Sequence, residues 1–171
     1  MLISDFLKVM IMKWLMVFPS TMLLAVLGVL GHGSAFAVEA VITKSMAPGP
    51  ILILSNSNDE PSVGFSRFNV SPSDISGEVS LKQKQLLGIQ WSTTYYPQTL
   101  NDEVELCYYR PYSSDRSCEP IRPNSSGVVE RFNDQPFGRG STVEIRHRVL
   151  GGMRPYARPA GVDSVTFRYR Y

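Results

Sequence analysis

The sequence is poor in the residues that build most catalytic and metal centres. It has two cysteines and two histidines in 171 residues, and His32 lies in an apolar N-terminal region that we expect to be removed. Zinc sites need three or four ligands, which His147 and two oxidised cysteines cannot supply. A Ser-His-Asp site needs a serine and a carboxylate beside the histidine, and no local pattern or G-x-S-x-G sequence indicates them. We expect no enzymatic activity, cofactor or metal, and His147 to be structural.

Other motifs are also missing. Gly138-Arg139-Gly140 and Gly151-Gly152 are expected to be turns, because a phosphate-binding loop has a longer glycine pattern. No stretch longer than ten residues has helical periodicity, and no apolar run after residue 37 is long enough to span a bilayer. Acidic stretches such as Asp59-Glu60 leave a loop calcium site as the one alternative to a metal-free protein.

Charge of one sign does not dominate the chain. Only two of the 17 lysines and arginines and one of the 15 acidic residues precede residue 38. The remainder is therefore almost neutral. We expect no binding to nucleic acid or to an anionic membrane by bulk electrostatic attraction.

What the sequence does contain begins with an export signal. Lys8 and Lys13 are followed by a mostly apolar stretch from Trp14 to Leu30, and then by the small-residue sequence Ala35-Phe36-Ala37. This is the pattern of a secretory signal peptide. We predict that residues 1–37 are removed and that the protein is located in the periplasm, on the cell surface or in the medium.

Cleavage is expected between Ala37 and Val38. A membrane anchor is the alternative, but the apolar stretch is interrupted by Pro19-Ser20-Thr21 and is shorter than the roughly 20 residues of a spanning helix. The sequence leaves open whether translation starts at Met1 or at Met12, since Lys13 follows either one.

The exported part has the pattern of an all-β protein. Apolar residues alternate with polar ones, as in Val143-Glu144-Ile145-Arg146-His147-Arg148-Val149, and clusters of Pro, Gly, Ser and Asn separate these runs. Short strands are expected near 39–43, 51–55, 77–82, 87–93, 103–110, 116–121, 127–132, 141–149 and 163–171. Seven to nine such strands predict a single antiparallel β-sandwich, immunoglobulin-like in shape, with a small barrel as the alternative.

The two cysteines predict a hairpin. Both Cys107 and Cys118 lie in the exported part, where thiols become oxidised. If they face each other on adjacent strands, Arg110 lies opposite Asp115, a favourable cross-strand pair. We therefore predict a disulfide that crosses a hairpin whose turn is near Tyr112-Ser113. The expected segments are a signal peptide at 1–37, a loop-rich N-terminal arm or peripheral strands at 38–76, and the sandwich core at 77–171.

Arginines predict a candidate binding face. Period-two geometry places Arg146 and Arg148 on one face of their strand, and Arg168 and Arg170 on one face of theirs. If the last two strands pair as a hairpin, the four side chains share one face, and Tyr169 is counted with them as a candidate binding residue. Arginine suits carboxylates, sulfates and phosphates, and tyrosine suits sugars and proteins. The alternative is that these arginines simply solvate the outside of a sheet.

The C-terminal strand indicates a class of partner. Val165, Phe167, Tyr169 and Tyr171 alternate up to the last residue, and in this the chain resembles the subunits of bacterial chaperone–usher fimbriae. It departs from their usual pattern at Arg170, the next-to-last residue. The resemblance implies an assembly chaperone or a neighbouring subunit that pairs with this strand, and an N-terminal arm beginning near Val38 that completes the next subunit.

Two functions remain at this point. The first is a non-enzymatic, exported bacterial surface or pilus-type protein, fimbrial or adhesin-like, that binds another protein or a glycan. The alternative is a free-standing periplasmic or secreted protein that acts as a soluble binding protein, an inhibitor or an envelope-accessory factor. Self-sufficiency separates them, because a pilus subunit lacks one strand of its own fold.

Overall fold

The computed structural model describes residues 37–56 and 61–171. The predicted signal peptide, apart from Ala37, lies outside the described residues, as do Asp59 and Glu60. The described chain forms a compact unit that ends at Tyr171. It is nearly all β and antiparallel, so the predicted β-sandwich is confirmed. No helix in the described part is long and apolar enough to cross a membrane.

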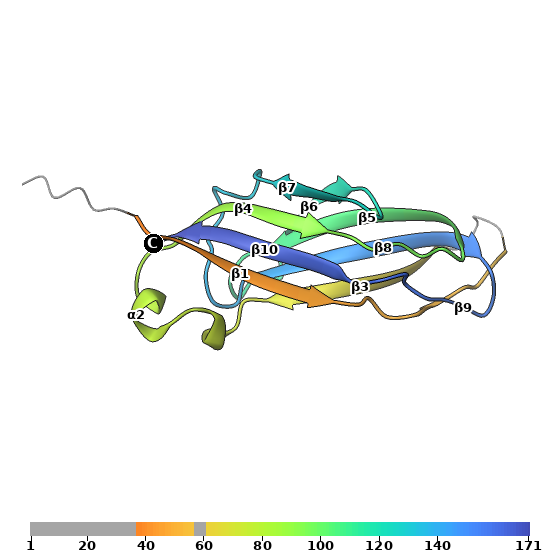
Figure 1. Ribbon diagram of the computed structural model, residues 1–171, viewed down its shortest axis with the longest axis horizontal. Coiled ribbons are helices and arrows are strands. Elements are labelled where there is room, and N and C mark those ends of the chain that lie inside the picture. The colour runs from red at the N-terminus through yellow and green to blue at the C-terminus, as the bar shows by residue number, and fades with distance from the viewer. Residues whose placement is uncertain (1–36, 57–60) are drawn as a thin grey trace, which may run out of the picture. The chain divides into compact units, whose positions relative to one another are not determined.

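Two four-stranded antiparallel sheets make up the sandwich, and a two-stranded ribbon adjoins them (Figure 1). The first sheet has the order β1-β10-β4-β7 and the second has the order β3-β8-β5-β6, while β2 pairs with β9. The strands are β1 (Glu39–Met46), β2 (Ile51–Leu52), β3 (Pro61–Asn69), β4 (Gln85–Ser92), β5 (Thr99–Tyr109), β6 (Arg116–Ile121), β7 (Ser126–Val129), β8 (Thr142–Gly152), β9 (Tyr156–Ala157) and β10 (Asp163–Arg170). The short helices are η1 (Pro72–Asp74) and α2 (Gly77–Ser80).

Alternating side chains from the two sheets form the main core. On β10, Val165, Phe167 and Tyr169 point inward and are buried. On the second sheet, β8 contributes Val143 and Ile145 to the same cluster. Side chains of a strand alternate between its two faces, so each of these strands supplies every second residue to the core. The period-two pattern seen in the sequence is therefore the pattern of burial.

The N-terminal strand completes the first sheet from within the same chain. β1 pairs with β10 over eight consecutive positions, from Glu39 opposite Arg170 to Met46 opposite Asp163. Beyond the ladder, Val38 and Tyr171 exchange two backbone hydrogen bonds of 3.1 Å. Ile42 is buried in the core beside β10. Both ends of the described chain are thus fixed to each other.

Segment 38–76 supplies strands to both sheets. β1 is an edge strand of the first sheet and β3 is an edge strand of the second. The sequence does not predict the strand at 61–69, because much of its inward face is small or polar and apolar side chains lie on its outward face. The inward positions include Gly64 and Ser66, whereas Val63 and Phe65 are about half exposed on the outer face. Phe68 is the one large side chain among these inward positions, and a single apolar residue does not show the alternation that predicts a half-buried strand.

The prediction of a strand at 77–82 is wrong. Val79 and Leu81 alternate with polar residues, but this segment contains the single helical turn α2 and the turn that follows it. The turn begins after Ser76, a residue type favoured at helix N-termini. Val79 packs against the core, whereas Leu81 is 91% exposed. Two apolar residues are too few to distinguish a strand from a helical turn.

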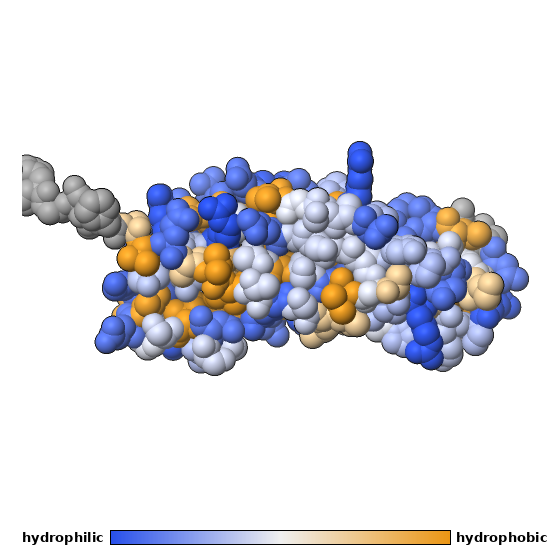
Figure 2. Space-filling model, viewed as in Figure 1, coloured by the Kyte–Doolittle hydropathy of each residue, from blue (hydrophilic) through white to orange (hydrophobic). Residues whose placement is uncertain are grey.

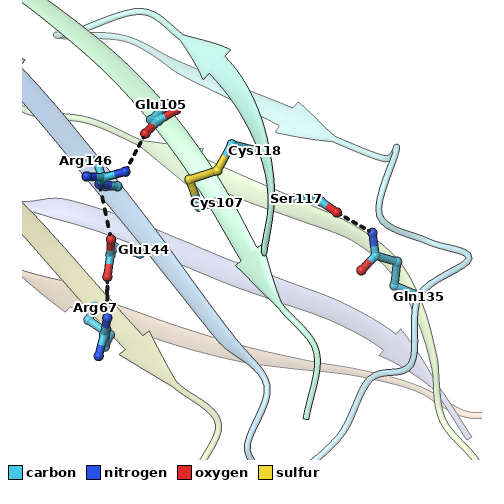
Figure 3. The surroundings of a disulfide bond; sticks show 8 residues. All are labelled: Arg67, Glu105, Cys107, Ser117, Cys118, Gln135, Glu144 and Arg146. Carbon is cyan, nitrogen blue, oxygen red and sulfur yellow. Dashed lines mark hydrogen bonds and ion pairs between the residues drawn. A yellow bond between two sulfur atoms is a disulfide. The ribbon is translucent and has the colours of Figure 1, made fainter. Parts of the chain in front are cut away.

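The predicted disulfide hairpin is confirmed. Cys107 on β5 lies directly opposite Cys118 on β6, and the two sulfur atoms are bonded (Figure 3). Arg110 and Asp115 form an ion pair of 2.7 Å at the turn end of the hairpin. Tyr112 lies in the turn with a φ of 55°. The register is the one that pairing of the cysteines required.

We predict that this disulfide is formed in the exported protein and contributes measurably to its stability. Cross-linking residues 11 positions apart removes loop entropy worth about 3 kcal/mol from the unfolded chain. The double variant Cys107→Ala/Cys118→Ala should lose about that much free energy of unfolding in urea titrations. Mass spectrometry of the unreduced wild-type protein should detect no free thiol. Two alkylatable cysteines in the folded protein would contradict the prediction.

Candidate functional site

The predicted arginine face does not exist, because its members lie on different sheets. Arg146 and Arg148 are on β8, which pairs with β3 and β5, whereas Arg168 and Arg170 are on β10, which pairs with β1 and β4. Each of these two strands already has a neighbour on both sides. The prediction of a C-terminal hairpin between β8 and β10 is therefore wrong. Tyr169, the fifth candidate binding residue, is only 4% exposed and lies in the core.

Neighbouring side chains also satisfy these four arginines. Arg146 pairs with Glu105 at 2.9 Å and with Glu144 at 3.4 Å, and Glu144 also binds Arg67 at 2.7 Å (Figure 3). The remaining pairs are Arg148 with Glu103, Arg168 with Glu39, and Arg170 with the side-chain oxygen of Gln85. The outer face of the second sheet is thus a ladder of alternating charges that neutralises itself.

His147 is the centre of a buried polar cluster. Its Nδ1 lies 3.1 Å from a carboxylate oxygen of Asp102, and its Nε2 lies 3.2 Å from one of Asp163. Asp163 also accepts hydrogen bonds from the hydroxyl of Ser66 at 2.8 Å and from the backbone N–H of Thr94 at 2.9 Å. The cluster joins three strands of the second sheet to β10 of the first.

The imidazole is held in its charged form. Burial by itself lowers its pKa, but the hydrogen bonds and negative charges of Asp102 and Asp163 outweigh burial and raise the pKa of His147 to about 9. Both ring nitrogens therefore donate to carboxylates. The ring edge of Tyr96 packs against the imidazole with centroids 5.3 Å apart. Asp102 and Asp163 raise the pKa of the Tyr96 phenol in addition to the effect of burial.

This arrangement does not resemble a hydrolase site. Ser66 donates its hydrogen bond to Asp163 and not to the imidazole. The side chains of His147 and Asp163 have no exposed surface, and that of Asp102 is 8% exposed. A nucleophile must contact both a base and a substrate. The cluster has no such access in this structure, and the structural role predicted for His147 stays a prediction.

A second group resembles a metal site only by residue type. One ligand atom each of Glu105, Cys107 and Cys118 lies within 4.8 Å of the others. Metals bind thiolates, and both cysteine sulfurs are used in the disulfide. This group does not fit a metal ion while the disulfide is intact.

An open groove lies among three loops near one end of the sandwich. Its volume is about 830 Å³. The connection from α2 to β4 contributes Ser80 and residues 82–85, the β5–β6 turn contributes Pro111 and Tyr112, and the β7–β8 connection contributes residues 133–139. None of these segments was expected to form a site, because sequence spacing does not bring separate loops together.

The groove contains three cations and one anion. The cations are Lys82, Lys84 and Arg139, and the anion is Asp134. Within the described chain, none of the three has a carboxylate at ion-pair distance, in contrast to the arginines of the sheet faces. The sequence signal for them was weak. Lys82 and Lys84 are the last lysines of the chain, and Arg139 stands between two glycines.

We predict that stability falls as pH rises, because of His147. Its folded-state pKa of about 9 is higher than the ordinary 6.5. The contribution of protonated His147 to the free energy of unfolding is therefore complete below about pH 6.5. This contribution, at most about 3 kcal/mol, is lost as pH rises through about 9. Urea unfolding at about pH 6 and about pH 9 measures this difference.

The variant His147→Gln should remove that pH dependence and lower the free energy of unfolding by about 3–5 kcal/mol, because two buried carboxylates lose their partner. Arg148→Gln, one residue away on the exposed side of β8, is the matched control and should change stability by less than about 1 kcal/mol. A pH profile that is the same in wild type and His147→Gln would contradict the assignment.

Comparisons with known proteins do not assign this chain to a family. No family model matches it, and no curated protein matches it. Among solved structures it is similar to the crystal structure of FLHE, with a TM-score of 0.48 and 14% identity over 78% of this chain and 98% of that one. It is also similar to the cryo-EM structure of Mud crab tombus-like virus, with a TM-score of 0.37 and 11% identity over 87% of this chain and 96% of that one. Similarity at this level does not transfer a function.

Proposed function

We propose that this chain is an exported, free-standing binding protein that folds without a partner and acts in the periplasm or as a secreted protein. It would work by binding and not by catalysis. The observation that carries the proposal is the pairing of β1 with β10 along the whole of both strands. This pairing supplies, from the chain itself, the strand that a fimbrial subunit would take from a neighbour.

The pilus-type alternative requires the opposite arrangement. In strand addition, an extended segment of one chain completes the sheet of another. Here the last strand already has β1 on one side and β4 on the other. Ile42, on the segment that was the candidate arm, is 6% exposed and packs in the core of its own domain. A subunit of the pilus type would have to release this strand before assembly.

The position of the predicted cleavage site agrees with an independent domain. Cleavage between Ala37 and Val38 would leave β1 intact, because the strand begins at Glu39. It would also place the new amino terminus at Val38, which is hydrogen-bonded to Tyr171. Processing would therefore remove none of the residues that form the sandwich.

The surface is also consistent with a free-standing protein. On the face drawn in Figure 2, apolar residues form small patches separated by polar ones. Large contiguous apolar surfaces mark obligate interfaces or membrane contacts. Phe65 and Val63 on β3 are exposed apolar residues, but Arg67 lies beside them on the same face of the strand, 5.9 Å from the Phe65 ring.

The proposal predicts how substitutions in β1 affect the isolated protein. Ile42→Ala should lower the free energy of unfolding by about 2–5 kcal/mol, as for other truncations in a core. The matched control is Val41→Ala on the outer face of the same strand, where Val41 is 64% exposed. It should change stability by no more than about 0.5 kcal/mol. Urea unfolding and light scattering of the protein purified after export measure stability and oligomeric state.

A free-standing protein should be monomeric and should unfold in one cooperative transition. Aggregation of the exported wild type, or recovery only in complex with a chaperone, would contradict the proposal. So would equal stability of Ile42→Ala and Val41→Ala, because β1 would then not be part of the isolated fold.

Export itself gives a further prediction. When the full-length chain is expressed with its own N-terminal sequence in a bacterium, the mature protein should begin at Val38. N-terminal sequencing of the periplasmic fraction measures this, with Ala37→Gln as a variant that should impair processing because the site requires a small residue. An intact N-terminus in the membrane fraction would contradict it.

A further inference from the structure

The groove between the loops is lined by cations that form no ion pair with a carboxylate among the described residues. Lys84 donates its ammonium hydrogens to the backbone oxygens of Ser80 and Lys82, at 3.0 and 2.7 Å. Arg139 donates through one terminal nitrogen to the backbone oxygen of Ile75, while its buried Nε has no hydrogen-bond partner among the described residues. Burial and the nearby charge of Arg139 both lower the pKa of Lys84. Lys84 and Arg139 line the same groove, and neither has a carboxylate at ion-pair distance among the described residues, an arrangement that favours a bound anion.

An exposed aromatic ring lines the same groove. Tyr112 is 87% exposed, and its φ of 55° is uncommon for a bulky residue. Its ring packs over Gly140, where an added Cβ would lie 2.9 Å from a ring carbon. Gly140 itself has a φ of 83°, a conformation that glycine adopts without strain. Strained residues that hold an exposed group in one place are common at ligand sites.

Neutral polar groups line the rest of the groove. Gln83, Gln85, Asn133 and Gln135 line it with side-chain amides, which both donate and accept hydrogen bonds. Gln85 already accepts from Arg170, Asn133 donates to the backbone oxygen of Leu87, and Gln135 donates to Ser117, so a ligand would use their remaining donors and acceptors. The side-chain oxygen of Asn133 is buried and has no hydrogen-bond partner among the described residues. The lining segments are mostly loops, and Gln85, at the start of β4, already pairs with Arg170 of β10. An added peptide strand therefore finds no free sheet edge in the groove.

We infer that this groove binds a saccharide that carries carboxylate or sulfate groups. Lys82, Lys84 and Arg139 would bind its anionic groups, the amides would hydrogen-bond its hydroxyls, and the Tyr112 ring would stack on an apolar sugar face. A flat ring, amide side chains and cations without carboxylate partners together match such a ligand better than they match a run of glutamates, whose side chains have no ring to stack. The inference names the ligand of the binding protein proposed above and therefore rests on that function.

The test uses the full-length chain after export and purification, with four probes in calorimetric titrations. These probes are oligogalacturonate, dextran sulfate, unmodified dextran of similar length, and poly-L-glutamate. We expect oligogalacturonate or dextran sulfate to bind at least about tenfold more tightly than dextran and poly-L-glutamate. Affinity should also fall as salt is raised, because the ion pairs are exposed.

Variants separate the contributions of charge and ring. Arg139→Gln and Lys84→Gln should each weaken binding by about tenfold, the loss of one charge-assisted hydrogen bond. Tyr112→Ala should weaken it as well, whereas Tyr112→Phe, which keeps the ring, should bind like the wild type. Arg148→Gln is the matched control, since it removes one positive charge from the sheet face where Glu103 already pairs with it. Lys82→Gln provides a further variant if Arg139→Gln does not fold.

The inference fails if no anionic saccharide binds, if poly-L-glutamate binds as tightly as the saccharides, or if Arg148→Gln loses as much affinity as Arg139→Gln. Tyr112→Ala that binds like the wild type would also overturn it. Light scattering and urea unfolding of the same samples distinguish this failure from failure of the proposed function. A stable monomer without saccharide binding contradicts only the ligand, whereas an aggregated or partner-dependent protein contradicts the function itself.

Discussion

The ion pairs of His147 with Asp102 and Asp163 are the interaction on which the arrangement of the interior depends. It crosses from the second sheet to the first, and a buried ion pair is tolerated only when its hydrogen bonds are complete. Ser66 and the backbone of Thr94 complete those of Asp163. The inward side chains of β3 are small or polar at Gly64 and Ser66, beside this cluster, whereas Phe68 further along the strand packs in the main core. The polar cluster lies between a large apolar core and a smaller one that contains Tyr96, Val149 and Ala157.

The distribution of charge outside the core follows a different rule. On the sheet faces, arginines and glutamates stand opposite each other in register, as Arg146 does with Glu105 and Arg148 with Glu103. Such pairs are exposed and contribute little to stability, but they leave no net charge for a ligand. Cations without a carboxylate partner among the described residues are found instead in the loop groove, beside the exposed ring of Tyr112. Binding surfaces are commonly built on loops that a rigid sheet positions, and the groove fits that pattern.

The pairing of the first and last strands is the observation that favours the proposed free-standing protein over a pilus subunit. An alternating C-terminal strand is equally suited to a partner strand from another chain or to one from its own. Here the chain supplies β1, which buries Ile42 and joins the two ends of the domain. Pairing with β1 covers the edge of β10 to which a strand of another chain would otherwise pair. This is why a self-contained binding protein accounts for the structure better than a subunit that waits for its neighbour.

The sequence by itself determined the all-β class, the disulfide hairpin with its register, and the outward position of each arginine on its own strand. These are local properties, because strand periodicity and a pair of cysteines depend on neighbours along the chain. Only the tertiary structure decided that β8 and β10 belong to different sheets, which separated Arg146 from Arg168. It also decided that Asp102 and Asp163 meet at His147, and that Lys84, Tyr112 and Arg139 meet at one groove. Strand order and loop contacts depend on residues far apart in sequence, and no spacing rule encodes which of several compatible pairings buries the most apolar surface.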